Sequence, residues 1–112
     1  MIINTEQKDN FSLLKVNIER LDSTVSSDLK AELVKINKSG ERNIMVDLSD
    51  VKYCDSSGLS ALLIGNRLCN EADGKFIINS LQDMVEKMIQ ISQLDKILNI
   101  SESIEEGNEM LA

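Results

Sequence analysis

The segment Asp55-Ser56-Ser57-Gly58 holds the side chains of this sequence that are best suited to chemistry. It follows the apolar run 44–46 and precedes a mostly apolar stretch over residues 59–68, a pattern that predicts a buried strand, a loop and a helix packed on the strand. The two hydroxyls would then lie at a helix N-terminus, where free backbone N–H groups and the helix dipole favour an anion. A serine in such a position can cap the helix, contact a ligand or be phosphorylated.

These hydroxyls admit three functional interpretations and one structural one. A catalytic serine needs a base, but the sequence contains no histidine and no buried lysine partner is identified. The Gly-x-x-x-x-Gly-Lys-Ser/Thr loop that binds phosphate is absent, because Gly58 is the only glycine in the segment. Phosphorylation by a partner requires only an exposed hydroxyl. In the structural interpretation, Asp55 or Ser56 simply caps the helix.

Length and composition restrict the function classes further. The 112 residues predict a single domain over 1–112, and the net charge of −7 disfavours both nucleic acid and anionic membranes as partners. No apolar run is long enough to span a bilayer and no signal segment opens the chain, so a cytoplasmic protein is expected. Cys54 and Cys69 lack metal-ligand spacing and are expected to be two buried thiols, and we expect neither a metal nor a cofactor.

Hydrophobic periodicity predicts the element order β-β-α-β-α-β-α-β-α. The repeated β-α-β crossovers imply a single α/β domain with about four helices on a mostly parallel sheet of four to five strands, and the first two strands form an antiparallel hairpin at its edge. The expected strands are 2–8, 11–18, 43–48, 75–79 and 97–100. The expected helices begin after Asp22-Ser23 and end at Gly40, run from the segment 55–58 to Gly74, follow Ser80, and extend from Ser101 to about Leu111.

Two of these helices carry more detailed predictions. In the third, Ser80 and Asp83 resemble a capping box, and Met84, Val85, Met88 and Ile89 are expected to form a core stripe. In the second, helical spacing turns Ala61, Ile64, Gly65, Leu68 and Ala72 toward the sheet, with Leu62 and Cys69 at the margin of that face. Leu63 falls on the opposite arc with Ser60, Asn66, Arg67 and Asn70, and Leu59 lies close to it. Leu63 with Ser60 and Arg67 is therefore a candidate docking surface, although single exposed leucines are common.

The motif Asp47-Leu48-Ser49, followed by Val51 and by Asp55-Ser56-Ser57-Gly58-Leu59, resembles the signature of the STAS domain, and within that family the bacterial anti-sigma factor antagonists. Leu21-Asp22 at the first helix start, Leu94-Asp95-Lys96-Ile97 before the last strand and the order of segments extend the likeness over nearly the whole chain. This resemblance implies that Ser56 is the phosphoacceptor, with Ser57 less favoured. It also matches Asp22 to an acidic position near the acceptor.

The family pattern is not followed everywhere. Glu19 stands where many members have glycine, no proline precedes the third helix, and Gly107 replaces a frequent alanine. None of these departures touches the acceptor segment, by which we mean Asp55-Ser56-Ser57-Gly58. They bear on the subfamily to which the chain belongs and not on its fold.

The resemblance implies a regulatory binding protein that is not an enzyme. Its unmodified form would bind an anti-sigma factor that is also a serine kinase of histidine-kinase-like ATPase fold, and so free a sigma factor. Phosphorylation would release this partner, and a metal-dependent serine phosphatase would reverse the modification. We expect no nucleic acid, no membrane insertion and a monomer or weak homodimer. The expected partner-binding residues are Asp22, Asp55, Ser56, Ser57, Gly58, Ser60, Leu63 and Arg67.

A different class of function is a STAS subunit of a larger assembly, such as a lipid-transport complex or a stress-signalling scaffold. Such members often lose the acceptor serine or carry additional domains. The retained Ser56 therefore favours the free antagonist.

Overall fold

The computed structural model of this chain describes residues 2–111. Its helices and strands follow the predicted order, with two short strands added. They are β1 (Ile3–Gln7), β2 (Ser12–Val16), β3 (Arg20–Leu21), α1 (Ser23–Lys38), β4 (Ile44–Asp47), β5 (Tyr53–Cys54), α2 (Ser56–Glu71), β6 (Phe76–Asn79), α3 (Asp83–Ile91), β7 (Asn99–Ser101) and α4 (Ile104–Met110), and a 3-10 turn covers Leu94–Lys96.

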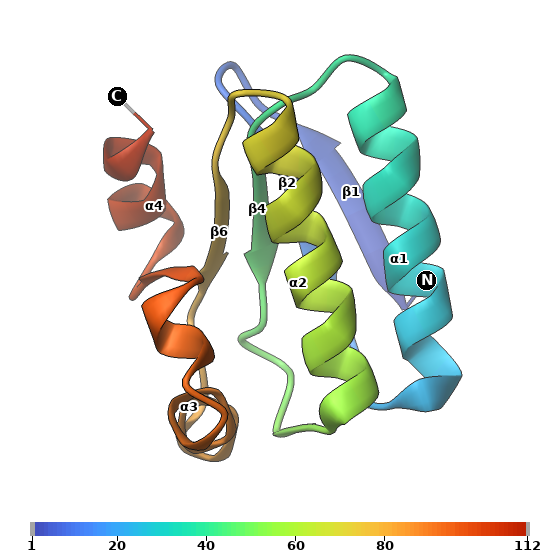
Figure 1. Cartoon of the computed structure of the whole chain (residues 1–112), viewed down its shortest axis with the longest axis vertical. Coiled ribbons are helices and arrows are strands. Elements are labelled where there is room, and N and C mark those ends of the chain that lie inside the picture. The colour runs from blue at the N-terminus through green and yellow to red at the C-terminus, as the bar shows by residue number, and fades with distance from the viewer. Residues whose placement is uncertain (1, 112) are drawn as a thin grey trace.

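The described residues form a five-stranded sheet in the order β1-β2-β4-β6-β7. β1 and β2 are antiparallel, and the other three pairings are parallel. Helices α1 and α2 lie side by side over one face of this sheet (Figure 1). The predicted α/β class, with an antiparallel hairpin at the N-terminal edge, is confirmed. The pair β3–β5 was not predicted, because two-residue strands are too short to show a hydrophobic period.

The core has one apolar cluster on each face of the sheet. Because successive strand residues point to opposite faces, Val46 and Ile78 pack under α1 and α2, whereas Met45 and Ile77 pack under α4. Leu62, on α2, belongs to the larger cluster and is fully buried. The strands next to the acceptor segment are therefore held from both sides.

The predicted start of the third helix is wrong. Ser80 lies outside α3 in a left-handed conformation, with a φ of 60°, and Gln82 is the N-cap without a side-chain hydrogen bond. Val85 and Ile89 are buried as expected, but Met84 is 52% exposed. A helix of nine residues that packs by one face leaves its other apolar positions in solvent.

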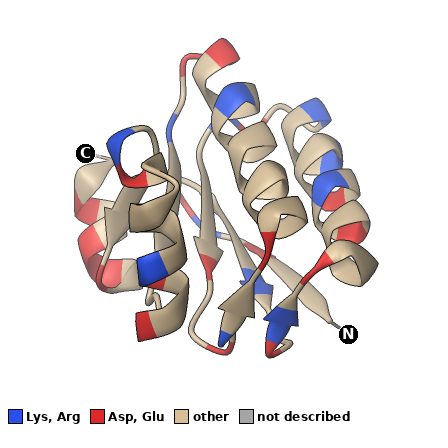
Figure 2. Cartoon of the chain, turned by 60° about the horizontal axis from the view of Figure 1, so that its bottom comes forward, with Lys and Arg blue, Asp and Glu red and all other residues tan. Residues whose placement is uncertain are grey.

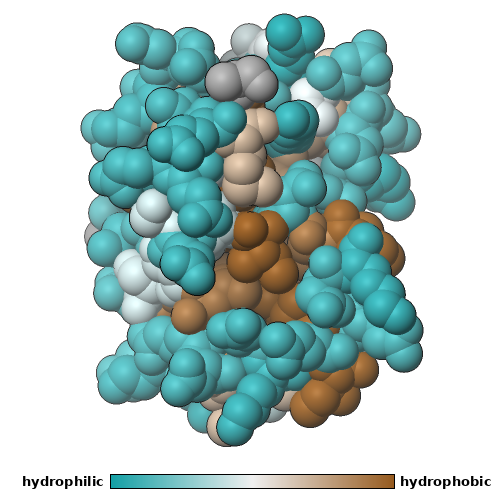
Figure 3. All heavy atoms as spheres, turned by 90° about the vertical axis from the view of Figure 1, so that its left-hand side faces the viewer, coloured by the Kyte–Doolittle hydropathy of each residue, from teal (hydrophilic) through white to brown (hydrophobic). Residues whose placement is uncertain are grey.

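The last strand and helix are also shifted along the chain. The 3-10 turn delays β7 until Asn99, so Ile97 is 56% exposed and not in a strand. Ser101 is a buried residue of β7, and the cap of α4 is Ser103, whose hydroxyl oxygen accepts the Glu106 N–H at 3.1 Å. Apolar side chains gather on the surface of this side of the molecule, which carries α3 and α4 (Figure 3).

Candidate functional site

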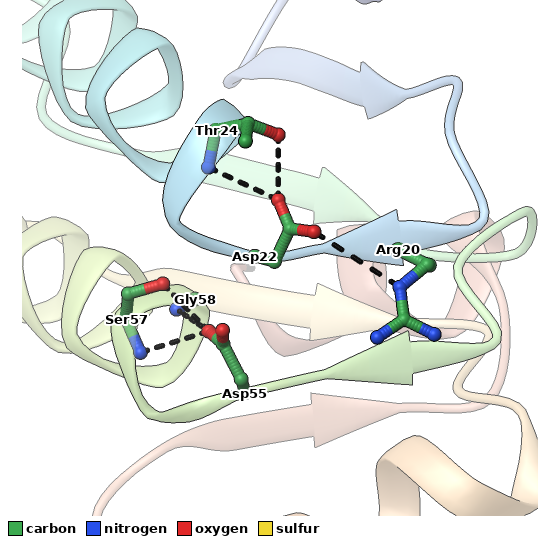
Figure 4. Close-up of polar contacts among 6 residues, drawn as sticks. All are labelled: Arg20, Asp22, Thr24, Asp55, Ser57 and Gly58. Carbon is green, nitrogen blue, oxygen red and sulfur yellow. Dashed lines mark hydrogen bonds and ion pairs between the residues drawn. The ribbon is translucent and has the colours of Figure 1, made fainter.

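The short β3–β5 pair brings the starts of two helices together. Leu21 and Cys54 are paired in the parallel register, and the Asp55 N–H donates to the Leu21 carbonyl at 3.2 Å. Each strand passes directly into an aspartate and then into a helix, α1 after Asp22 and α2 after Asp55. The two aspartates therefore lie close together at one end of the molecule (Figure 4).

Asp55 is the N-cap of α2. Its Oδ1 accepts the Ser57 N–H at 2.9 Å, the Gly58 N–H at 3.1 Å and the Ser57 hydroxyl at 2.6 Å. The choice between Asp55 and Ser56 as the cap is thus resolved in favour of Asp55. One carboxylate oxygen satisfies two of the N–H groups that a helix start leaves unbonded.

Asp22 repeats this arrangement at the start of α1. Its Oδ1 accepts the Thr24 N–H at 3.0 Å and the Thr24 hydroxyl at 2.6 Å. Arg20 lies between the two helix starts, with its Nε 4.0 Å from Asp22 Oδ2 and its guanidinium 4.6 Å from the centre of the Tyr53 ring. Acidic residues precede both helices in Figure 2. Arg20 places a positive charge beside them (Figure 4).

Gly58 allows the start of α2 to approach β3. A Cβ at this position would lie 2.6 Å from the Leu21 carbonyl oxygen and 2.7 Å from Cys54 Sγ, closer than side-chain atoms pack. The glycine of the motif is therefore required by packing. This close approach sets how far the start of α2, with Ser56 and Ser57, lies from β3.

The two serines of the segment have different environments. Ser56 is the first residue of α2 and is exposed, and its hydroxyl makes no hydrogen bond to any residue in the described part of the chain. Ser57 is half-buried and its hydroxyl donates to Asp55. Ser56 is thus the hydroxyl that is free to meet another molecule.

Hydrogen bonding holds both carboxylates in the charged form. The pKa of Asp55 is lowered mainly by the Ser57 hydroxyl and the Gly58 N–H, and that of Asp22 mainly by the Thr24 hydroxyl and N–H. A carboxylate with a lowered pKa is a poor general base at neutral pH, although Asp55 contacts the Ser57 hydroxyl. Among the described residues, no group of three or more His, Cys, Asp or Glu could hold a metal ion.

Both cysteines are buried and free, as predicted. Burial raises the pKa of the Cys54 thiol to about 12 and that of Cys69 to about 11. At neutral pH both are protonated, and they contribute to packing under the acceptor segment and α2.

The predicted docking residues do not all lie at the surface. Ser60 and Arg67 are exposed, but Leu63 is half-buried and packs against the core. Asn66, expected on the exposed arc with them, is only 6% exposed. The buried face of α2 is displaced from the predicted one because α2 packs on α1 as well as on the sheet: Leu59, Leu62 and Cys69 are buried, and Ile64, Leu68 and Ala72 are half-buried.

Sequence reasoning missed three residues of this region. Thr24 had a recognisable signal, because a Thr two residues after an Asp at a helix start is a common capping partner. Arg20 and Tyr53 had none, since they meet only through pairing of the unpredicted strands β3 and β5.

The chain belongs to the STAS domain family, whose sequence model matches residues 3–107. It is 29% identical over 103 residues to the anti-sigma-B factor antagonist of Staphylococcus aureus, a match that covers 92% of this chain and 94% of that protein. Among solved structures, a candidate anti-sigma factor antagonist of Thermotoga maritima superposes with a TM-score of 0.91 at 24% identity, covering 97% of this chain and 93% of the other.

The phosphorylated form of the Bacillus cell-fate determinant SpoIIAA also shares the fold. Its TM-score is 0.74 at 18% identity, with 98% of this chain and 99% of that chain covered. No helix in the described part of the sequence has the length and hydrophobicity needed to cross a membrane.

Proposed function

We propose that this protein is an anti-sigma factor antagonist that is switched by phosphorylation of Ser56. The unmodified protein binds an anti-sigma factor that is also a serine kinase of histidine-kinase-like ATPase fold, in the cytoplasm, and thereby frees a sigma factor. The kinase transfers phosphate to Ser56 and the complex dissociates. A serine phosphatase then regenerates the binding form.

The observation that carries this proposal is the exposed and unbonded Ser56 hydroxyl at the first residue of α2. The kinase partner supplies the base, because the bonds that cap the helix lower the pKa of Asp55 and so make it a poor general base. Ser57 is disfavoured as the acceptor because modifying it would break its hydrogen bond to Asp55. The name of the Staphylococcus aureus relative supports the same class of function.

A phosphoryl group on Ser56 would act on the partner more than on the domain. Asp55 already accepts the N–H groups at the start of α2 that would otherwise bind an anion. The phosphate, with its added charge of about −1.5 to −2, would therefore lie on the solvent side of the helix start, where a partner binds. A shift from 99% bound to 1% bound requires about 5.5 kcal/mol of differential affinity. A phosphate desolvated beside Asp55 and Asp22 is not paired by a cation of the partner, and Arg20 is already shared with Asp22. It supplies repulsion and a desolvation cost of this order.

The docking surface proposed around Ser56 comprises Asp22 and Asp55, the exposed Ser60 and Arg67, and the outer edge of Leu63, with Ser57 and Gly58 shaping the backbone. The alternative, a subunit of a larger STAS assembly, would use other surfaces. It does not require Ser56 to be modified.

Incubation with a candidate anti-sigma factor kinase and ATP, followed by mass spectrometry of the peptide that contains both serines, tests the proposal. Wild type should gain one phosphate on Ser56 and lose its kinase complex on a sizing column. Ser56→Ala should remain unmodified and bound, and Ser57→Ala should still be phosphorylated. Phosphate on Ser57 alone, or a phosphorylated protein that stays bound, would contradict the mechanism.

A further inference from the structure

Strand β1 leaves one edge of the sheet without a partner among the described residues. The Lys8 N–H donates to the Phe11 carbonyl, and the Asn17 N–H donates to the Ile2 carbonyl. Hydrogen-bonded pairs alternate along an antiparallel ladder, so the even-numbered residues of β1 turn their backbone groups toward β2. The backbone N–H and C=O groups of Ile3, Thr5 and Gln7 therefore point outward.

This edge lacks the features that normally prevent strand pairing. Ile3–Gln7 contains no proline and no lysine, and its only charge is Glu6. The opposite edge is shorter and partly covered: β7 has three residues, and the Glu102 N–H that follows it donates to the Glu106 side chain. Of the two edges, β1 is the one that offers several free backbone groups in a row.

An apolar groove runs beside β1. It has a volume of about 400 Å³ and lies between the start of β1 and the outer side of α1, which runs next to this edge (Figure 1). Ile2, which is 43% exposed, lines it together with Ile3 and Ala31, and the carboxylates Asp28 and Glu32 complete its α1 side. Thr5 marks the middle of the strand and is tied to α1, because its hydroxyl donates to Glu32 Oε1 at 3.2 Å.

Two exposed charges on the outer stripe of α1, Asp28 and Lys35, are self-complementary about this point, whereas Glu32 lies near it and would approach its own equivalent. Asp28 and Lys35 lie at nearly equal distances along the helix on either side of Ala31 and Glu32, and both are exposed. A two-fold axis through Thr5 would reverse the second copy. It would therefore set Asp28 of each copy near Lys35 of the other, with the small Ala31 at the crossing.

We propose that a second copy of this chain occupies the β1 edge, in a two-fold dimer with antiparallel β1 strands and a continuous ten-stranded sheet. Thr5 pairs with its own equivalent, and Ile3 pairs with Gln7 of the other copy, which are the residues whose backbone groups point outward. Antiparallel pairing places the two Ser56 loops at opposite ends of the dimer. Each loop then remains free for a partner.

Sedimentation equilibrium of the full chain tests this interface by changing one outward N–H. Thr5→Pro removes the N–H that faces the second copy and none that bonds to β2, and should raise the dimer dissociation constant about tenfold or more. Thr5→Val is the matched control, because it deletes the bond to Glu32 but keeps the N–H, and should have a much smaller effect. Thermal unfolding should show that both variants fold.

Charge exchange provides the second arm of the experiment. Lys35→Glu should weaken the dimer about tenfold, and Lys35→Glu combined with Asp28→Lys should restore it. Lys87→Glu, the same charge change at an exposed position of α3, should leave the dimer intact. A monomer at all concentrations up to about 1 mM, or a dimer unaffected by Thr5→Pro and Lys35→Glu, would overturn the proposal. A complex formed only with a foreign strand peptide would also overturn it.

Discussion

A single hydrogen bond distinguishes two adjacent serines of identical chemistry. The Ser57 hydroxyl completes the cap at Asp55, whereas Ser56, one position earlier, starts the helix with its hydroxyl in solvent. The capping aspartate therefore has two effects. It orders the start of α2, and it engages the Ser57 hydroxyl, which would otherwise compete with Ser56 in the proposed phosphorylation.

The Asp55 cap predicts a pH dependence of stability. Its folded-state pKa lies below the ordinary value of 3.8, so its contribution is present above about pH 3.8 and is lost as the pH falls through the folded pKa. Asp55→Asn can still accept the capping bonds but cannot titrate in this range. The melting temperatures of wild type and Asp55→Asn should therefore differ at about pH 7 and converge as the pH falls below 3.8 and through the folded pKa.

The control for this measurement is Asp95→Asn, which removes an exposed carboxylate that makes no hydrogen bond in the described part of the chain. Its difference from wild type should show no such convergence. A constant difference between wild type and Asp55→Asn across this pH range would show that the cap bonds do not favour the charged carboxylate.

At the level of elements, the site depends on the close contact of α2 with β3. Gly58→Ala would place a methyl group 2.6 Å from the Leu21 carbonyl oxygen and 2.7 Å from Cys54 Sγ. The first is a backbone atom of β3 and the second belongs to a fully buried side chain, so neither can easily move away. We expect a loss of about 1–3 kcal/mol in the free energy of unfolding, measured by urea titration. Ser60→Ala, at an exposed position two residues later, should change it by less than about 0.5 kcal/mol. Equal stabilities would mean that α2 can move away from β3 freely.

The elements also show where sequence reasoning succeeds. Residues 44–46 and 76–78 are continuous apolar runs, and the strands that contain them were predicted because burial on both faces leaves such a run. Helix α1 was also predicted, because Asp22 and Gly40 mark its two ends. Gly40 has a φ of 103°, the left-handed conformation that commonly follows a helix. The acceptor segment was located because it lies between an apolar run and an apolar helix.

Features that depend on tertiary contacts were not predictable. Asn66 is only 6% exposed in a helix that packs on α1 as well as on the sheet, and no local pattern encodes the second neighbour of α2. Ser80 and Ser101 each precede an expected helix, but hydrogen bonds along β6 and β7 hold both residues in the sheet region, where the Ser80 N–H donates to the Ser101 carbonyl. Local capping signals were thus overridden by strand pairing.

For the whole molecule, the net charge of −7 limits the kind of partner that the proposed site can accept. A partner surface that matches this domain is basic, and phosphorylation adds charge of the sign that the domain already carries. Long-range attraction between such surfaces mainly accelerates encounter. The affinity itself depends on contacts close to Ser56.

The rate of association with the proposed anti-sigma factor kinase should therefore fall as salt is raised. Between about 50 mM and about 500 mM NaCl we expect the association rate constant to drop by tenfold or more, because the Debye length contracts from about 14 Å to about 4 Å, while the dissociation rate constant changes much less. Stopped-flow mixing of the labelled proteins measures both. Neutralising Asp50, an exposed residue in the loop before β5, as Asp50→Asn should lower the salt dependence, and Glu105→Gln on α4 should not. A salt-independent association rate would place the kinase contact outside the influence of this acidic surface.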